Sequence, residues 1–287
     1  GVARRRGLWL ATALIGVLAC LLWTSELGGA IAAVALAIAS GTEEGIDAVI
    51  HAVHGLVRAG CVNADVASFD PDAVLPWARR ARGAWADIHE ELLAWERAAI
   101  GAGVAPPFSA VDPVQVHLTP ESDCWRTLWL RVYGGDAVAA RAFPQTMSLL
   151  NDRHVSSAMF SILGAGCAIR PHQGLNNMVL RYHLGIAVPP ASTSGATPER
   201  LSLRVAQLHP DGGADTRARL AAESTLEFQW SNGSDLLFDD TFPHEVVNER
   251  TSGRRVVLFV DVVRQDCARH VNWALPLLSR ALGYTAH

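Results

Sequence analysis

The sequence lacks an excess of positive charge, a C-x-x-C pair and any internal repeat. Its 24 basic residues are outnumbered by 28 acidic ones, and the net charge of −4 argues against a nucleic-acid-binding protein. Hydrophobic residues make up 50% of the 287 residues, which excludes a disordered chain and provides enough apolar side chains for a core. The length predicts one large domain or two small ones.

Cysteine is sparse and widely spaced. The five cysteines are Cys20, Cys61, Cys124, Cys167 and Cys267. An odd number without close pairs excludes the usual zinc site built from cysteines. Free or partly buried thiols are the simplest interpretation, and a disulfide such as Cys61 to Cys124 stays open because sequence does not reveal connectivity.

The N-terminus is apolar. Arg4 to Arg6 precede an apolar run over residues 8–23, and a second run follows over residues 27–39. A spanning helix needs about 20 apolar residues. Three interpretations stay open: a single-pass anchor, a signal peptide cleaved near Ser40, and a helical hairpin. We expect residues 1–40 to be an anchor or signal segment, which places the rest on the luminal or extracytoplasmic side, whereas a hairpin keeps it cytosolic.

Residues 41–113 are expected to form a helical region that packs on the core. Apolar residues recur there at helical spacing, first at Ile46, Val49, Ile50, Val53 and Leu56. A second predicted helical stretch covers residues 77–100, with Trp85, Ile88, Leu92 and Trp95 along one face. These tryptophans are interpreted as core-packing side chains. The segment 101–107 breaks the pattern and marks a boundary.

Residues 114–287 are expected to form a β domain. Short runs rich in β-branched and aromatic residues are separated by Gly, Pro and Asn clusters. The predicted strands cover residues 127–133, 158–163, 179–188, 226–230, 236–238 and 256–263. Many short strands between turn signals predict a sandwich or a barrel.

Two histidines lie where packing does not explain them. His172 follows a proline at the mouth of a strand, and His244 lies at the end of a turn after another strand. They are far apart in the sequence, so only the fold brings them together. Imidazole suits iron, and a site with few protein ligands leaves positions open for substrate and oxygen.

Cationic side chains accompany these histidines. Arg255 heads an apolar strand, and a guanidinium that points into a barrel needs a partner, most naturally a carboxylate. Arg181 and His183 alternate with apolar residues and therefore face the same side of their strand. Two imidazoles beside groups that bind carboxylates suit an oxoacid cosubstrate.

These segments resemble the aspartyl/asparaginyl β-hydroxylases, a branch of the double-stranded β-helix oxygenases. The resemblance covers about half of the chain clearly, from Thr127 to Arg264. It rests on ordered blocks that begin at Phe160, Pro171, Leu180, Phe238 and Arg255. It implies a mainly β fold with α-helices: a cupin-like jelly-roll core flanked by N-terminal helices.

The resemblance also implies roles for individual residues. His172 and His244 would be the ligands of Fe(II), and Arg255 would bind the distal carboxylate of 2-oxoglutarate. Ser161, Arg181 and His183 would hold the cosubstrate end nearer the metal. Such an enzyme consumes O₂ and 2-oxoglutarate and hydroxylates a carbon atom. Arg254 lies next to Arg255, but the alignment of the following strand favours Arg255.

Three further positions bear on this site. Most related oxygenases carry a metal-binding carboxylate two residues after the first histidine, where this chain has Gly174, as the β-hydroxylases do. Asp239 and Asp240 are expected to form a structural turn. Glu245 is expected to orient the neighbouring His244.

The substrate is expected to be an Asp or Asn residue of a protein, hydroxylated at its β-carbon. A lipid acyl chain and a small amino-acid derivative are the alternatives. An apparent insertion over residues 207–224 bears on this choice because loops at a barrel mouth usually select the substrate. An inactive cupin-like binding protein is the alternative from another class.

Overall fold

The computed structural model describes residues 63, 65–98, 105–111, 118–119, 124–174, 179–190, 199–207, 220 and 225–266. Most of them belong to one compact unit, residues 65–174 and 180–262; a second unit comprises residues 1–64, 175–179 and 263–287. The predicted anchor and the predicted helix over residues 46–56 lie outside the described residues. Within the described part of the chain, no helix is both long enough and apolar enough to cross a membrane.

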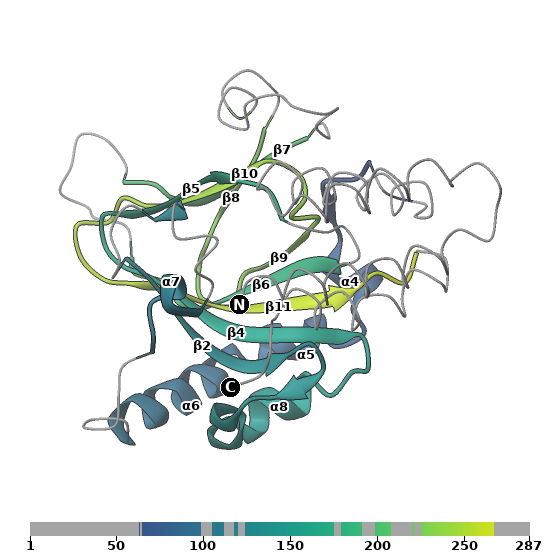
Figure 1. Cartoon of the computed structure of the whole chain (residues 1–287), viewed down its shortest axis with the longest axis vertical. Coiled ribbons are helices and arrows are strands. Elements are labelled where there is room, and N and C mark those ends of the chain that lie inside the picture. Colours follow the sequence, from purple (N-terminus) through teal and green to yellow (C-terminus); the bar gives the residue numbers. More distant parts are fainter. Residues whose placement is uncertain are drawn as a thin grey trace, which may run out of the picture. The chain divides into compact units, whose positions relative to one another are not determined.

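Two antiparallel sheets face each other in the larger unit (Figure 1). The first has seven strands in the order β1-β9-β6-β11-β4-β2-β3, and the second has four in the order β5-β10-β7-β8. The strands are β1 (Ser68–Phe69), β2 (Trp125–Val132), β3 (Gly135–Asp136), β4 (Val155–Leu163), β5 (Cys167–His172), β6 (Val179–Ala187), β7 (Leu201–Ala206), β8 (Thr225–Gln229), β9 (Asp235–Phe238), β10 (His244–Asn248) and β11 (Arg255–Val263). The two facing sheets confirm the predicted double-stranded β-helix.

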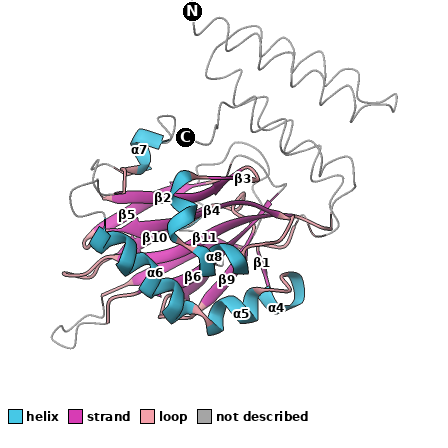
Figure 2. Cartoon of the chain, turned by 90° about the horizontal axis from the view of Figure 1, so that it is seen from below, coloured by secondary structure: helices cyan, strands magenta, loops and turns pink. Residues whose placement is uncertain are grey.

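Short helices cover the outer face of the seven-stranded sheet (Figure 2). They are α4 (Pro71–Val74), α5 (Ala78–Gly83), α6 (Trp85–Ala98) and α8 (Pro144–Leu149). Two further short helices are α7 (Phe108–Val111), which precedes β2, and the 3₁₀ helix η2 (Val138–Ala142), which precedes α8. The helical stretch predicted over residues 77–100 is thus confirmed as two helices that meet at Ala84. Trp77 is buried, and Trp85 and Trp95 pack against the same core, as predicted.

Side chains of the large sheet alternate between its two faces and contribute to a separate apolar core on each face. In β11, Val256 and Leu258 pack toward the helices, whereas Val257 and Phe259 pack into the space between the sheets. Because side chains alternate between the two faces of a strand, Arg255 and Asp261 belong with the inner pair. Ser161 of β4 and His183 of β6 fall on the inner face by the same rule. Strand alternation therefore places these four polar side chains between the two sheets.

The strand predictions succeed for the large sheet and largely fail for the small one. The runs predicted within β2, β4, β6, β9 and β11 are confirmed to within three residues at either end, and so is β8 of the small sheet. Strands β5, β7 and β10 of the small sheet were not predicted, and neither were the two-residue strands β1 and β3 of the large sheet. Strand β5 contains Pro171, which a strand tolerates only at a sheet edge, and β10 contains the charged Glu245. Both therefore lack the apolar pattern of a buried strand.

A disulfide joins the two sheets. Cys124 lies directly before β2, and Cys167 is the first residue of β5. Their Cα atoms are 5.6 Å apart. The prediction of free thiols is therefore wrong for these two residues, and Cys124 does not pair with Cys61, which lies outside the described residues.

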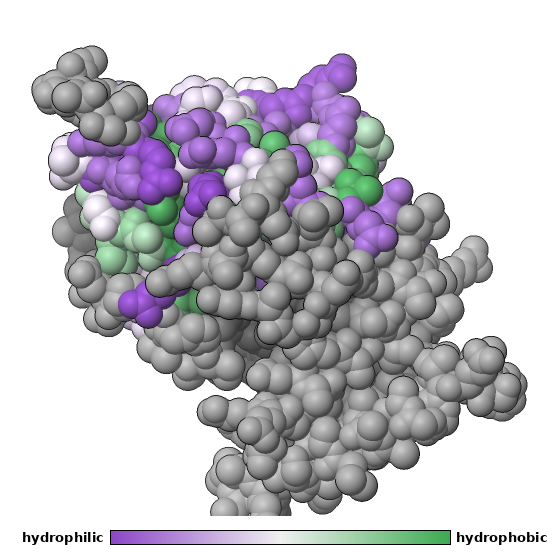
Figure 3. Space-filling model, turned by 90° about the horizontal axis from the view of Figure 1, so that it is seen from above, coloured by the Kyte–Doolittle hydropathy of each residue, from purple (hydrophilic) through white to green (hydrophobic). Residues whose placement is uncertain are grey.

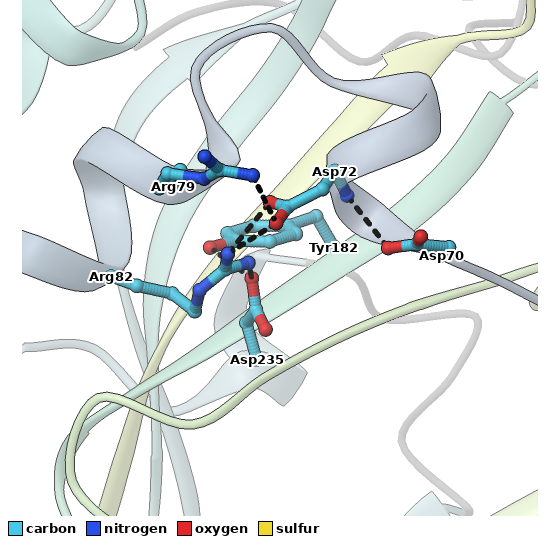
Figure 4. Close-up of polar contacts among 6 residues, drawn as sticks. All are labelled: Asp70, Asp72, Arg79, Arg82, Tyr182 and Asp235. Carbon is cyan, nitrogen blue, oxygen red and sulfur yellow. Dashed lines mark hydrogen bonds and ion pairs between the residues drawn. The ribbon is translucent and has the colours of Figure 1, made fainter.

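An ionic cluster fixes α4 and α5 to the large sheet (Figure 4). Arg82 of α5 donates to both carboxylate oxygens of Asp72, at 2.7 Å each, and to Asp235 of β9 at 2.7 Å. The Tyr182 hydroxyl donates to the same Asp235 at 3.1 Å. Burial, followed by the charge of Asp235, raises the pKa of Tyr182, which stays protonated at neutral pH. Helices and sheet are thus held together by charged hydrogen bonds as well as by the core.

Glu91 of α6 holds the start of α8. Its carboxylate accepts from the backbone N–H groups of Gln145 (2.7 Å) and Thr146 (3.0 Å) and from the Thr146 hydroxyl (2.7 Å). We expect Glu91→Ala to lower the free energy of unfolding by about 2 to 3 kcal/mol, because buried donors lose their acceptor. Urea unfolding measures this, and Glu90→Ala, at an exposed position of the same helix, is the control. Equal losses in both variants would contradict the assignment.

Candidate functional site

The structure brings His172 and His244 side by side. Strands β5 and β10 are antiparallel neighbours, and the two histidines are direct partners in their register. Their ring centroids are 4.1 Å apart. A break in the register between His244 and Val246 accompanies this pairing. His244 is only 2% exposed, whereas His172 is partly exposed at the edge of the small sheet.

Backbone carbonyl groups orient both imidazoles in the same way. The Nδ1 atom of His172 lies 2.7 Å from the carbonyl oxygen of Arg170, and Nδ1 of His244 lies 2.9 Å from that of Phe242. A carbonyl oxygen only accepts, so Nδ1 carries the proton and Nε2 keeps its lone pair. Metal-binding histidines are commonly held by such a bond. Burial also lowers the pKa of His244 to about 3, which keeps the ring neutral.

Gly174 and Asp240 share one space. A Cβ atom added to Gly174 would collide with the Asp240 carboxylate, and the Gly174 N–H donates to the Asp240 carbonyl oxygen at 2.6 Å. A side chain at position 174 is therefore excluded while Asp240 keeps its place. Asp239, in contrast, accepts from the N–H and hydroxyl groups of Thr241, as expected for a structural turn.

Arg181 binds two carboxylates, those of the buried Asp240 and the partly buried Asp261. Its guanidinium lies 2.7 Å from Asp240 and 2.9 Å from Asp261, and it stacks over the Phe259 ring at 4.2 Å. Burial opposes the charged form, but the two carboxylates outweigh burial and raise the pKa of Arg181. The cation that the sequence suggests for a cosubstrate thus has two acidic partners within the protein. Asp261 lies on the same face of β11 as Arg255, which a period of two residues reveals in the sequence.

Arg255 has far fewer partners. It is 1% exposed, and its Nη2 donates to the Ser161 hydroxyl oxygen at 3.1 Å. Its Nε and Nη1 have no hydrogen-bond partner among the described residues. Burial lowers the pKa of Arg255 to about 9, so the group still carries its charge at neutral pH. A buried cation with two unsatisfied donors fits an anionic ligand.

Aromatic residues line the surroundings of Arg255. Its guanidinium lies over the ring of Trp230 at 4.7 Å, and the Trp125 indole donates to Ser161 at 3.0 Å. Neither tryptophan was singled out from the sequence. Ser161 thus lies with Arg255, rather than with Arg181 as the sequence suggested. Any ligand of Ser161 would also meet Arg255.

His183 is buried between aromatic rings. Both of its ring nitrogens lack a partner among the described residues, and the ring centroid lies 5.3 Å from that of Phe259 and 5.4 Å from that of Phe238. Burial, and then the charge of Arg255, lower the pKa of His183 well below its usual value. His183 is therefore neutral and has one N–H available to donate.

Two neighbours of the site point away from it. Glu245 follows His244 on the opposite face of β10 and binds Arg204 of β7 at 2.7 Å, so the prediction that it orients His244 is wrong. The Phe242 carbonyl takes that role. Arg254 is exposed and binds Glu96 at 2.6 Å, which separates it clearly from Arg255.

The outer surface seen in Figure 3 is mainly hydrophilic where residues are described.

The protein is expected to lose stability in acid because of His244. An unfolded histidine has a pKa near 6.5, so below that pH the unfolded chain binds a proton that the folded site excludes. The expected loss is about 2 kcal/mol at pH 5. Burial raises the pKa of Asp240 and Asp261, which acts in the opposite direction.

The variant His244→Gln isolates this effect, because an amide does not titrate. Urea unfolding from pH 7.5 to pH 4.5 should show a flatter decline in the variant than in the original protein. Parallel declines would show that His244 protonates freely in the folded state.

The chain resembles known hydroxylases in sequence. Residues 82–265 match the family described as aspartyl/asparaginyl beta-hydroxylase. An ornithine lipid ester-linked acyl 2-hydroxylase of Rhizobium tropici is 31% identical over 207 residues, which cover 71% of this chain and 63% of that protein. The aspartyl/asparaginyl beta-hydroxylase of Mus musculus is 27% identical over 146 residues, which cover 49% of this chain and 16% of that protein.

A structural comparison finds a Pseudomonas putida prolyl-4-hydroxylase, with a TM-score of 0.38 and 17% identity, covering 62% of this chain and 87% of the other. Family membership rests on the sequence match, which spans the described strands from β2 to β11 and the helix α6. This chain is a member of the aspartyl/asparaginyl β-hydroxylase family.

Proposed function

We propose that the protein is an Fe(II)- and 2-oxoglutarate-dependent dioxygenase that hydroxylates an unactivated carbon. One observation carries the proposal: among the described residues, the buried Arg255 has two unsatisfied donors in the same interior as a pair of histidines with oriented lone pairs. A neutral structural pocket needs neither feature. A dicarboxylate cosubstrate beside a metal ion accounts for both.

The residues fit these two groups. Nε2 of His172 and Nε2 of His244 would hold the iron. No group of three His, Cys, Asp or Glu residues in metal-binding geometry occurs among the described residues, so the proposed site uses these two protein ligands. A bound iron ion with 2-oxoglutarate would supply the activation of oxygen and the oxidation of a C–H bond.

The remaining residues bind, orient and exclude water. Arg255 and Ser161 would bind the distal carboxylate, with the Trp230 ring covering the guanidinium. His183 would donate its N–H to the oxoacid, since its ring is neutral and close to both Arg255 and His244. Arg181 would not touch the cosubstrate directly. It would hold Asp240 in place near the metal end of the site, where the Oδ1 atom of Asp240 has no partner among the described residues.

The proposed substrate is the acyl chain of an amino-acid-containing lipid. The lipid hydroxylase of Rhizobium tropici matches 71% of this chain, against 49% for the mouse enzyme, whose name indicates Asp and Asn residues. The Asp/Asn β-carbon, which the sequence alone favoured, is the second candidate and rests on the family match. A membrane anchor over residues 8–39 suits a lipid substrate and stays a prediction.

Mass spectrometry tests both candidates. The purified protein is incubated with Fe(II), 2-oxoglutarate and ¹⁸O₂, and with either ornithine lipid or peptides that contain Asp and Asn. A product with one ¹⁸O atom on the acyl chain, together with equimolar succinate, supports the lipid. Label on the peptides reverses the order of the candidates. No succinate with either substrate, coupled or uncoupled, would favour an inactive binding protein.

A further inference from the structure

Strand β5 carries His172 and is weakly held by its own sheet. It lies at the edge of the four-stranded sheet, where β10 is its only strand neighbour among the described residues. Pro171 removes one backbone donor next to His172, and the register with β10 is irregular at this end. The position of the proposed metal ligand therefore depends on whatever else fixes β5.

The Cys124–Cys167 disulfide is such a constraint. It attaches the first residue of β5 to the start of β2 in the other sheet. The turn between β4 and β5 packs tightly against it: Gly164 donates its N–H to the Cys124 carbonyl oxygen at 2.9 Å, and a Cβ on Gly164 would lie 3.2 Å from Cys167 Sγ. The bond thus lies in a closely packed junction between the sheets.

The same bond leads to both halves of the site. On one side, Cys167 begins the strand that ends at His172. On the other, Cys124 precedes Trp125, whose indole binds Ser161, the hydrogen-bond partner of Arg255. Breaking the bond would let β5, and with it the proposed metal ligand His172, move more freely. It would also loosen Trp125, and with it the proposed cosubstrate-binding residues Ser161 and Arg255.

We propose that the Cys124–Cys167 disulfide is a redox clasp that positions His172 for metal binding, an inference that rests on the proposed function. In the oxidised clasp the two sulfurs are bonded. A dithiol reductant supplies two electrons and two protons, which convert the sulfurs to separate thiols, and itself becomes a disulfide. A phosphine supplies the two electrons and becomes a phosphine oxide, with water supplying the oxygen atom and the two protons. A thiol oxidant reverses the step. The active form would then belong to an oxidising compartment, in keeping with the expected extracytoplasmic location.

Peptide mapping tests whether the clasp exists. All five cysteines lie on different tryptic peptides; those of Cys124 and Cys167 are residues 98–126 and 154–181, because trypsin does not cut before Pro171. Full-length protein, alkylated without reductant and then digested, should yield these two peptides linked. Recovery of both peptides alkylated and separate would overturn the proposal.

Metal binding and hydrogen exchange test what the clasp does. Reduction with tris(2-carboxyethyl)phosphine should weaken Mn²⁺ binding about tenfold, the usual scale for losing the support of a metal ligand. In metal-free protein, the amides of residues 167–172 should exchange faster after reduction. The double variant Cys124→Ser/Cys167→Ser should behave as reduced protein and no longer respond to phosphine, whereas Cys61→Ser should respond fully.

The outcomes separate the two proposals. Equal exchange in the oxidised and reduced protein overturns the clasp, whatever the metal does. Equal Mn²⁺ affinity in both forms also overturns it, while leaving the iron site intact. Absence of Mn²⁺ binding in both forms overturns the proposed function instead, and the exchange data then decide on the clasp alone.

Discussion

Replacing either His172 or His244 by alanine is expected to abolish iron-dependent formation of succinate from 2-oxoglutarate. Each imidazole presents an Nε2 lone pair fixed by a backbone carbonyl, and the described residues offer no third protein ligand to compensate. Losing one of two ligands should therefore reduce Mn²⁺ affinity well beyond the 10- to 100-fold typical of lost supporting contacts. Isothermal titration with Mn²⁺ and a succinate assay with Fe(II) measure the two effects.

His154→Ala is the matched control for these variants. His154 is also partly buried and bonded through Nδ1, but to Asp152 in the turn before β4. This variant should keep both metal affinity and turnover. A His244→Ala protein that still binds Mn²⁺ as tightly as the original would contradict the assignment, because it would show that the metal is held elsewhere.

The sequence predicts the polar side chains of the large sheet well because each stands out against an apolar pattern. His183 and Arg255 interrupt the mostly apolar strands β6 and β11, and alternation assigns them to the inner face. Ser161 lies in a strand that contains two further serines, so it was identified only through the family resemblance. Asp261 obeys the same rule and was overlooked. The sequence does not reveal which arginine is paired with a carboxylate. Arg181 is paired and Arg255 is not, because the fold brings Asp240 and Asp261 next to Arg181.

Features of the small sheet are harder to predict. Strand β5 is an edge strand with exposed residues and a proline, so its pattern gives no signal. The partner of Cys124 depends on how the two sheets face each other, which no local pattern contains. His172 and His244 were identified through the resemblance and their unusual contexts, while their direct pairing emerges only from the strand order.

Replacing Arg255 by methionine is expected to raise the KM for 2-oxoglutarate about 100-fold. The variant loses a charged pair of hydrogen bonds to the cosubstrate, worth about 3 kcal/mol, while methionine roughly fills the same apolar space. Steady-state succinate formation measures the change. Arg254→Met is the control, since Arg254 is exposed and binds Glu96 on the outer surface. It should leave the KM unchanged.

The same variant should leave the ligand-free protein at least as stable as the original. A structural arginine with full partners destabilises a protein when it is removed. Arg255 is buried instead, and its Nε and Nη1 find no hydrogen-bond partner in the described part of the chain, so its charge costs free energy until an anion binds. Urea unfolding should therefore show Arg255→Met to be at least as stable as the original protein without 2-oxoglutarate and less stabilised by adding it. A destabilised variant with normal cosubstrate affinity would assign Arg255 to the core rather than to the site.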